Sequence, residues 1–215
     1  MGRLFAVLPW CILGFFAILI SSEYPQFPER WAVHFDFQSR PNGWMTKSYG
    51  AAFFPLGIAT ALCALFELIA RFGVTRNAQL SAPVQEQMVN FNRQLLHFVG
   101  VALATFMGYL AWRMPTAPDG SFLWPALLLF VGSVLVGPAI FLRRALQSIK
   151  GELPPGYTLL CYSNPDDKRV WVPKLSGMGS TLNFAHRAAW VWMAVLVALP
   201  LGMLGLAVVA AVKGR

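Results

Sequence analysis

The chain has 215 residues, of which 57% are hydrophobic and only 12% are charged. Soluble domains carry about 25% charged residues, so this composition, with its long uncharged runs, predicts a protein that spans a membrane and excludes a separate soluble enzyme domain. The formal net charge of +8 is not gathered in a compact cluster. It therefore favours contact with anionic lipid and argues against nucleic-acid binding.

Five segments are long and apolar enough to cross a bilayer, since about 20 apolar residues span a hydrocarbon core of about 30 Å. They are residues 4–20, 49–70, 95–112, 122–142 and 188–212. The predicted fold class is an all-α membrane protein with five transmembrane helices, a short extracytoplasmic β-like loop and a cytoplasmic β-hairpin. The predicted divisions are residues 1–71, 72–142, 143–187 and 188–215.

Residues 24–50 form a long non-helical stretch between the first two segments. Pro25 and Pro28 exclude a helix interior, and from Trp31 onward apolar residues alternate with polar ones, which is a strand pattern. The sequence RPNG at 40–43 has the residues of a turn. We therefore expect a short hairpin or a half-buried strand at the membrane surface.

Two interpretations of this loop stay open. In the first it packs at the membrane interface, with Trp31, Trp44 and Tyr49 at the depth of the lipid headgroups. In the second its side chains recognise a partner. The candidate binding residues of the loop are Trp31, His34, Phe35, Asp36, Asn42 and Trp44.

The loop also resembles a known signature. The runs PERW at 28–31, HFDF at 34–37 and RPNGW at 40–44, followed by Lys47, resemble the signature loop of a bacterial membrane-protein family of unknown function, the SdpI-like family. The resemblance covers roughly the first seventy residues. It implies an integral protein of the bacterial cytoplasmic membrane. For the family's known member it implies toxin immunity and signalling, in which a repressor is held at the membrane.

The distribution of basic residues predicts the sidedness of the chain. With five spans, eleven Lys and Arg residues lie on the side of the N-terminus and six on the other. Because positive loops stay in the cytoplasm, we expect the N-terminus inside and the C-terminus outside, with the loop at 24–50 external.

Polar residues near the inner ends of the second and third segments form a second candidate site. Glu67 and Arg71 stand one helical turn apart and can pair. Asn90, Arg93 and His97 lie on one face of an amphipathic lead-in to the third segment. They are candidate binding residues for a lipid phosphate, a substrate anion or a partner, or else they simply meet interfacial water and headgroups.

The loop at 143–187 is the largest connection. Residues 157–163 and 169–174 are rich in aromatic and β-branched types, and the sequence NPDDK between them supplies turn residues, so we expect these two runs to pair as a hairpin. The stretch 157–186 resembles a recurrent uncharacterised bacterial element. We do not expect the sequence GMGST at 177–181 to hold a nucleotide phosphate, because no strand, glycine-rich loop and helix stand in the required spacing.

The sequence predicts no catalytic residues, no metal site and no cofactor. Two sets of residues could supply metal ligands, namely His34 with Asp36, and His97 and His186 with Asp166, Asp167 or Cys161. The sequence contains no metal-ligand motif that supports either set. The three cysteines imply no disulfide framework.

The leading functional hypothesis is a non-enzymatic inner-membrane module for signal relay, immunity or service as an accessory subunit, which binds a peptide or protein partner. The alternative is a small-molecule transporter or membrane-embedded enzyme that acts as a homo-oligomer, a dimer. In that reading Pro55 and Gly57 mark a broken helix, and Glu67, Arg93 and His97 line an anion or proton path.

Overall fold

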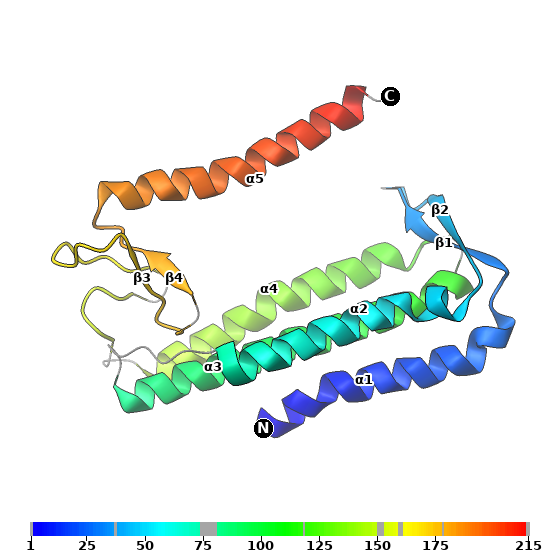
Figure 1. The fold of residues 1–215 in the computed structure, drawn as a ribbon, viewed down its shortest axis with the longest axis horizontal. Coiled ribbons are helices and arrows are strands. Elements are labelled where there is room, and N and C mark those ends of the chain that lie inside the picture. Colours follow the sequence, from blue (N-terminus) through cyan, green and yellow to red (C-terminus); the bar gives the residue numbers. More distant parts are fainter. Residues whose placement is uncertain are drawn as a thin grey trace. The chain divides into compact units, whose positions relative to one another are not determined.

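The computed structural model describes residues 2–36, 38–73, 81–117, 119–149, 153–158, 161–177 and 179–213. The protein is mostly helical, and among the described residues four helices are long and apolar enough to cross a membrane (Figure 1). They are α1 (Gly2–Glu23), α2 (Tyr49–Leu68), α3 (Ala82–Thr116) and α4 (Leu123–Ser148). The helix α5 (Arg187–Lys213) is apolar, but its stretch Arg187–Met203 is shorter than a span. These helices indicate a multi-pass membrane protein.

The chain forms two compact units. Residues 1–75 and 89–147 make the first, and residues 76–88 and 148–215 make the second. The first unit holds α1, α2, α4, most of α3 and one small sheet. The second holds a smaller sheet and α5.

The core of the first unit is built on closely packed helices. On α2 the buried residues are Ala52, Leu56, Ala59 and Cys63, which recur at the spacing of a single helix face. Two of the four are alanines, and small residues allow membrane helices to approach closely. This face packs in one core cluster with residues of α1, α3 and the loop, namely Leu13, Phe16, Ile20, Phe27, Trp31, Ala104 and Ala111.

The second and third helices differ from their predicted form. The helix α2 continues through Pro55 and Gly57, so these residues do not break it. The irregularity lies at its C-terminal end, where Ile69–Gly73 form a π-helical turn, η2. The helix α3 begins at Ala82, thirteen residues before the predicted span at 95, because the amphipathic lead-in is itself helical.

The loop between α1 and α2 is a β-hairpin, as expected. After a 3-10 turn, η1 (Tyr24–Gln26), the strands β1 (Arg30–Phe35) and β2 (Pro41–Thr46) pair antiparallel, and the register shifts around His34. The predicted position of the turn is wrong, because Pro41, Asn42 and Gly43 lie within β2. The chain reverses instead between Asp36 and Arg40, where the backbone N–H of Asp36 donates to the carbonyl of Arg40 and Ser39 has a positive φ of 60°.

Trp31 does not lie at the surface of the unit. It is only 3% exposed and packs edge-on against Phe27 in the core, whereas Trp44 and Tyr49 are exposed. The strand alternation is also incomplete, because Ala32 is buried next to Trp31. Trp31 and Ala32 pair in regular register with Met45 and Trp44, so their side chains point to opposite faces of the strand, and both faces are covered at this point.

The predicted pairing in the second unit is also wrong in part. The strand β3 (Trp171–Pro173) pairs antiparallel with β4 (Ser180–Leu182) and not with residues 157–163. Gly177 and Gly179 have φ values of 75° and 73° and make this tight turn possible. The earlier arm closes on itself through an antiparallel bridge between Tyr157 and Tyr162, and Tyr162 also bridges to Asn183.

Candidate functional site

A cleft of about 510 Å³ lies between the β1–β2 turn and the helices α3 and α4 of the first unit. The turn contributes Phe35, Asp36 and Ser39 to its lining, and β2 contributes Asn42. The helices contribute the apolar residues Phe106, Leu123, Trp124 and Leu127. The cleft therefore joins polar groups at the hairpin to an apolar wall on two membrane helices.

The carboxylate of Asp36 fixes the shape of the turn. Its Oδ1 accepts hydrogen bonds from the backbone N–H of Gln38 at 2.9 Å and of Arg40 at 2.8 Å, and its Oδ2 pairs with the Arg40 guanidinium at 3.2 Å. The backbone N–H of Arg40 is the main cause that lowers the pKa of this carboxyl below its ordinary value. Asp36 is therefore ionised at neutral pH and holds the rim of the cleft in place.

The loop between α3 and α4 supports the turn from the other side. Gly120 has a φ of 64°, and a Cβ atom there would lie 2.6 Å from the ring of Phe35 and 2.8 Å from the carbonyl of Ser39. Phe35 also meets Phe122 edge-on, with the ring centroids 6.3 Å apart. Glycine at position 120 thus lets the hairpin lie directly against the start of α4.

The other predicted residues of the hairpin lie outside this cleft. Trp31 and His34 border a second cavity of about 210 Å³ between the hairpin, α2 and α3. The ring of His34 lies across Gly43, where a Cβ atom would come within 2.8 Å of it. Trp44 is exposed. The hairpin therefore borders two cavities with different residues.

Three hydrogen bonds involve the segments next to the hairpin and the helix ends. Lys47 Nζ donates to the carbonyl oxygens of Phe27 at 2.8 Å and Pro25 at 3.2 Å. Glu23, the last residue of α1, accepts a hydrogen bond of 2.7 Å from the indole N–H of Trp112 on α3. Lys47 thus joins the two segments that flank the hairpin, and Glu23 joins the end of α1 to α3.

A polar cluster lies at the C-terminal end of α2. The Glu67 carboxylate accepts a hydrogen bond from Arg71 Nε at 2.6 Å and lies 2.8 Å from His97 Nε2. Arg93 Nε donates to the carbonyl of Ala70 at 3.1 Å, inside the π-helical turn. The structure therefore brings His97 and Arg93 to the end of α2, whereas Asn90 is exposed.

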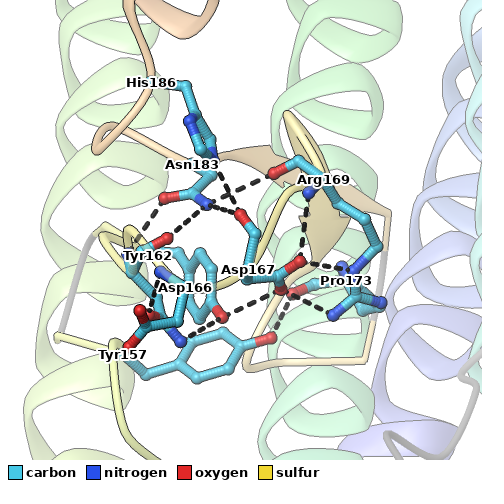
Figure 2. A network of polar contacts seen from close by, with 9 residues as sticks. Tyr157, Tyr162, Asp166, Asp167, Arg169, Pro173, Asn183 and His186 are labelled. Carbon is cyan, nitrogen blue, oxygen red and sulfur yellow. Dashed lines mark hydrogen bonds and ion pairs between the residues drawn. The ribbon is translucent and has the colours of Figure 1, made fainter.

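The second unit contains a hydrogen-bond network around a fully buried amide (Figure 2). The side-chain NH₂ of Asn183 donates to the carbonyls of Asn164, Asp167 and Arg169 at 2.8, 2.9 and 3.2 Å. Its oxygen accepts from the backbone N–H groups of Asn164 and Ala185. Asn183 thus joins the NPDD turn to the segment that leads into α5.

The other polar side chains complete this network. The Asp167 carboxylate pairs with the Arg169 guanidinium at 2.7 Å and accepts a hydrogen bond from the Tyr162 hydroxyl at 3.0 Å. The Arg169 side chain is the main cause that holds the pKa of Asp167 well below its ordinary value. His186 Nε2 lies 2.6 Å from the carbonyl of Asp167. These contacts hold the folded form of this segment. The Asp167 carboxylate is paired with Arg169.

The described part of the chain contains no group of three or more His, Cys, Asp or Glu residues placed to hold a metal ion. His97 contacts Glu67, and His186 contacts a backbone carbonyl of the NPDD turn. The glycines at 177 and 179 serve the β3–β4 turn, in which Gly177 N–H donates to the carbonyl of Lys174.

The comparisons with known proteins match two segments. Residues 10–59 match the model of a domain of unknown function (DUF1648), and residues 165–190 match the model of a family of unknown function (DUF5808). No curated protein and no solved structure matches the chain. The first segment covers α1 from Trp10 onward, the hairpin and the first half of α2, and the second covers Asp167, Arg169, Asn183 and His186 of the network. Two elements of uncharacterised type are therefore present where the sequence analysis expected them.

Sequence reasoning missed the helical half of the cleft. Trp124 and Leu127 stand in an unbroken apolar run, so no local pattern separates them from lipid-facing neighbours. Only the packing of the α3–α4 loop against the hairpin brings them to Phe35 and Asp36. Asn183 belongs to the stretch 157–186 that resembles an uncharacterised element, but nothing in the local sequence signals its burial.

Proposed function

We propose that the protein is a non-enzymatic membrane module that binds a peptide or protein partner in the cleft between the β1–β2 turn and α4. The supporting observation is the cleft itself, which combines the apolar wall of Phe106, Trp124 and Leu127 with the polar rim of Asp36 and Asn42. A partner with an apolar side chain next to polar backbone groups fits such a surface.

The proposed setting is the bacterial inner membrane, with α5 as a fifth span, the N-terminus inside and the C-terminus outside. The excess of Lys and Arg on the side of the N-terminus supports it. A thiol probe at Gln38 is then labelled from outside, whereas one at Asp167 is not. Labelling of Asp167 alone would invert the proposed orientation.

The resemblance of the hairpin to the SdpI-like signature supports a more specific role. Under it the external cleft captures a toxin-like peptide or an envelope partner, and the basic segment 143–187 meets a cytoplasmic one. Immunity, signal relay and service as an accessory subunit share this design.

Native mass spectrometry of the full chain, taken from its own membranes in mild detergent, tests the binding proposal. We expect a stoichiometric peptide or protein that Phe35→Ala and Trp124→Ala release. Phe72→Ala is the matched control, because Phe72 is 79% exposed at the opposite end of the second helix. Retention of the same partner by all three variants would contradict the cleft as its site.

A second candidate function is supported by the cluster at the inner end of α2. Glu67 lies between Arg71 and His97, and acidic residues in membrane helices often mark proton or ion pathways. Under this alternative a dimer transports a small anion or proton. The test is flux in liposomes for Glu67→Gln, Arg93→Gln and His97→Gln together, and unchanged flux would remove this candidate.

A further inference from the structure

Exposed tryptophans gather where the second sheet meets α5. Trp171 on β3 is 44% exposed, and Trp190 and Trp192 at the start of α5 are 61% and 46% exposed. Trp171 meets Trp192 edge-on at 5.8 Å, and Trp190 meets Phe184 edge-on at 5.1 Å. One aromatic pair thus joins the start of α5 to β3, and the other joins it to the segment that leads into the helix.

The positions of the two helix tryptophans identify the kind of surface that covers them. Residues two apart on a helix point about 200° apart, so Trp190 and Trp192 lie on nearly opposite faces of α5. A protein partner on one side of the helix cannot cover both rings. A layer of lipid headgroups surrounds a helix, and tryptophan is enriched at this depth.

Basic residues accompany these rings. Lys168, Lys174 and Arg187 are exposed, and no described ion pair involves them. Of the two aspartates of the turn, Asp167 is paired with Arg169. The surface therefore carries an excess of unpaired positive charge, which is complementary to anionic headgroups.

The dimensions agree with a single headgroup layer. Arg187 and Trp192 are separated along α5 by about 7.5 Å, at 1.5 Å per residue. The headgroup region on each side of a bilayer is about 5–7 Å thick, from its total and hydrocarbon thicknesses. The arginine at the helix start then reaches the phosphates, while the tryptophans reach the boundary of the acyl chains.

We propose that residues 153–186 dock on the surface of an anionic bilayer through Trp171 and Lys174, at the point where α5 enters the membrane. The inference rests on the proposed entry of α5 but not on partner binding in the cleft. Docking holds the segment with the Asn183 network against the membrane. The side of the segment that faces away from the membrane is then exposed to the aqueous phase.

The test uses the full chain in nanodiscs of phosphatidylcholine alone or with phosphatidylglycerol. The native cysteines are replaced by alanine, and a nitroxide is attached at Trp171→Cys or, with Trp171 intact, at Ser180→Cys on the paired strand. Relative accessibility to oxygen and to a water-soluble nickel chelate reports the depth of each label. We expect both labels to be protected from nickel but open to oxygen in anionic discs.

The charge dependence gives the decisive comparison. Lys168→Gln and Lys174→Gln should each shift the ratio of docked to undocked module about fivefold toward the undocked state. In a third chain, which keeps Cys161 and has only Cys11 and Cys63 replaced by alanine, a nitroxide on the exposed Cys161 should stay open to nickel. Nickel access at 171 and 180 in both lipids would overturn the proposal, as would protection from both reagents, which would indicate a protein cover. A label at Val197 that is open to nickel would show instead that α5 does not enter the membrane.

Discussion

Replacing Asn183 should unfold the network of the second unit while leaving the helices of the first unit in place. The Asn183 side chain makes five hydrogen bonds to backbone groups and is 0% exposed. At about 1 kcal/mol net for each bond, these contribute up to about 5 kcal/mol. Partial access of water to the released carbonyls reduces the expected loss to about 3 kcal/mol for Asn183→Asp, which keeps the shape but loses all three donated bonds.

Hydrogen exchange of the full chain in nanodiscs measures this loss. A cost of about 3 kcal/mol corresponds to more than a hundredfold faster exchange at the amides of Tyr162 and Val172, because opening of the unit becomes that much more frequent. Asn164→Asp is the matched control, since it makes the same charge change but loses only one donated bond, of 3.4 Å, to Tyr162. If the exchange rates of Asn183→Asp and Asn164→Asp differ less than threefold, Asn183 is not the residue that holds the network together.

Two further predictions concern charge and packing. The folded pKa of Asp167 lies below its ordinary value because of Arg169, so the pair stabilises the second unit fully above about pH 4 and progressively less as the pH falls below it. In Asp167→Asn, protection from hydrogen exchange should therefore depend less on pH below about pH 4. An unchanged pH profile would contradict the stabilising role of the pair. In the first unit, a Cβ atom at Gly108 would collide with the ring of Phe16, whereas one at Gly132 meets nothing within 4 Å. Gly108→Ala should therefore be about 1–3 kcal/mol less stable than Gly132→Ala in thermal unfolding in detergent, and equal midpoints would disprove the close approach of α1 and α3.

Much of the helical architecture follows from the sequence because membrane helices are marked by length and hydropathy. The end of the second segment and the pairing of Glu67 with Arg71 follow from spacing alone. The start of α3 does not, because its first turns are amphipathic and lack the continuous apolar run that defines a span. Helical periodicity and hydropathy thus give different boundaries for the same helix.

The small sheets show why strand pairing is harder to predict. The RPNG sequence has turn chemistry, yet the Asp36 carboxylate caps an earlier turn and draws Pro41 and Asn42 into β2. In the second unit, the NPDD sequence does form a turn, but Asn183 binds that turn from a distant part of the chain. Each strand pairing depends on hydrogen bonds made by one specific side chain, Asp36 or Asn183. Secondary-structure propensities do not predict such bonds.

The binding cleft depends on contacts between distant segments. Phe35, Asp36 and Asn42 stand out in the sequence as aromatic and polar residues of a long non-helical loop. Trp124 and Leu127 become part of the same surface only because Gly120 allows the α3–α4 loop to pack against the hairpin. Local pattern can therefore identify one wall of the cleft but not the other.

Site-specific photocrosslinking on α4 tests partner binding in the cleft most directly. Leu127 lines the cleft, whereas the adjacent Leu128 does not line it and is 67% exposed. The two positions lie about 1.5 Å apart along the helix, and therefore at the same membrane depth, but point about 100° apart. With benzoylphenylalanine at each position in native membranes, we predict a discrete peptide or protein adduct from position 127 and only lipid adducts from position 128. The same adducts from both positions would contradict the proposed function.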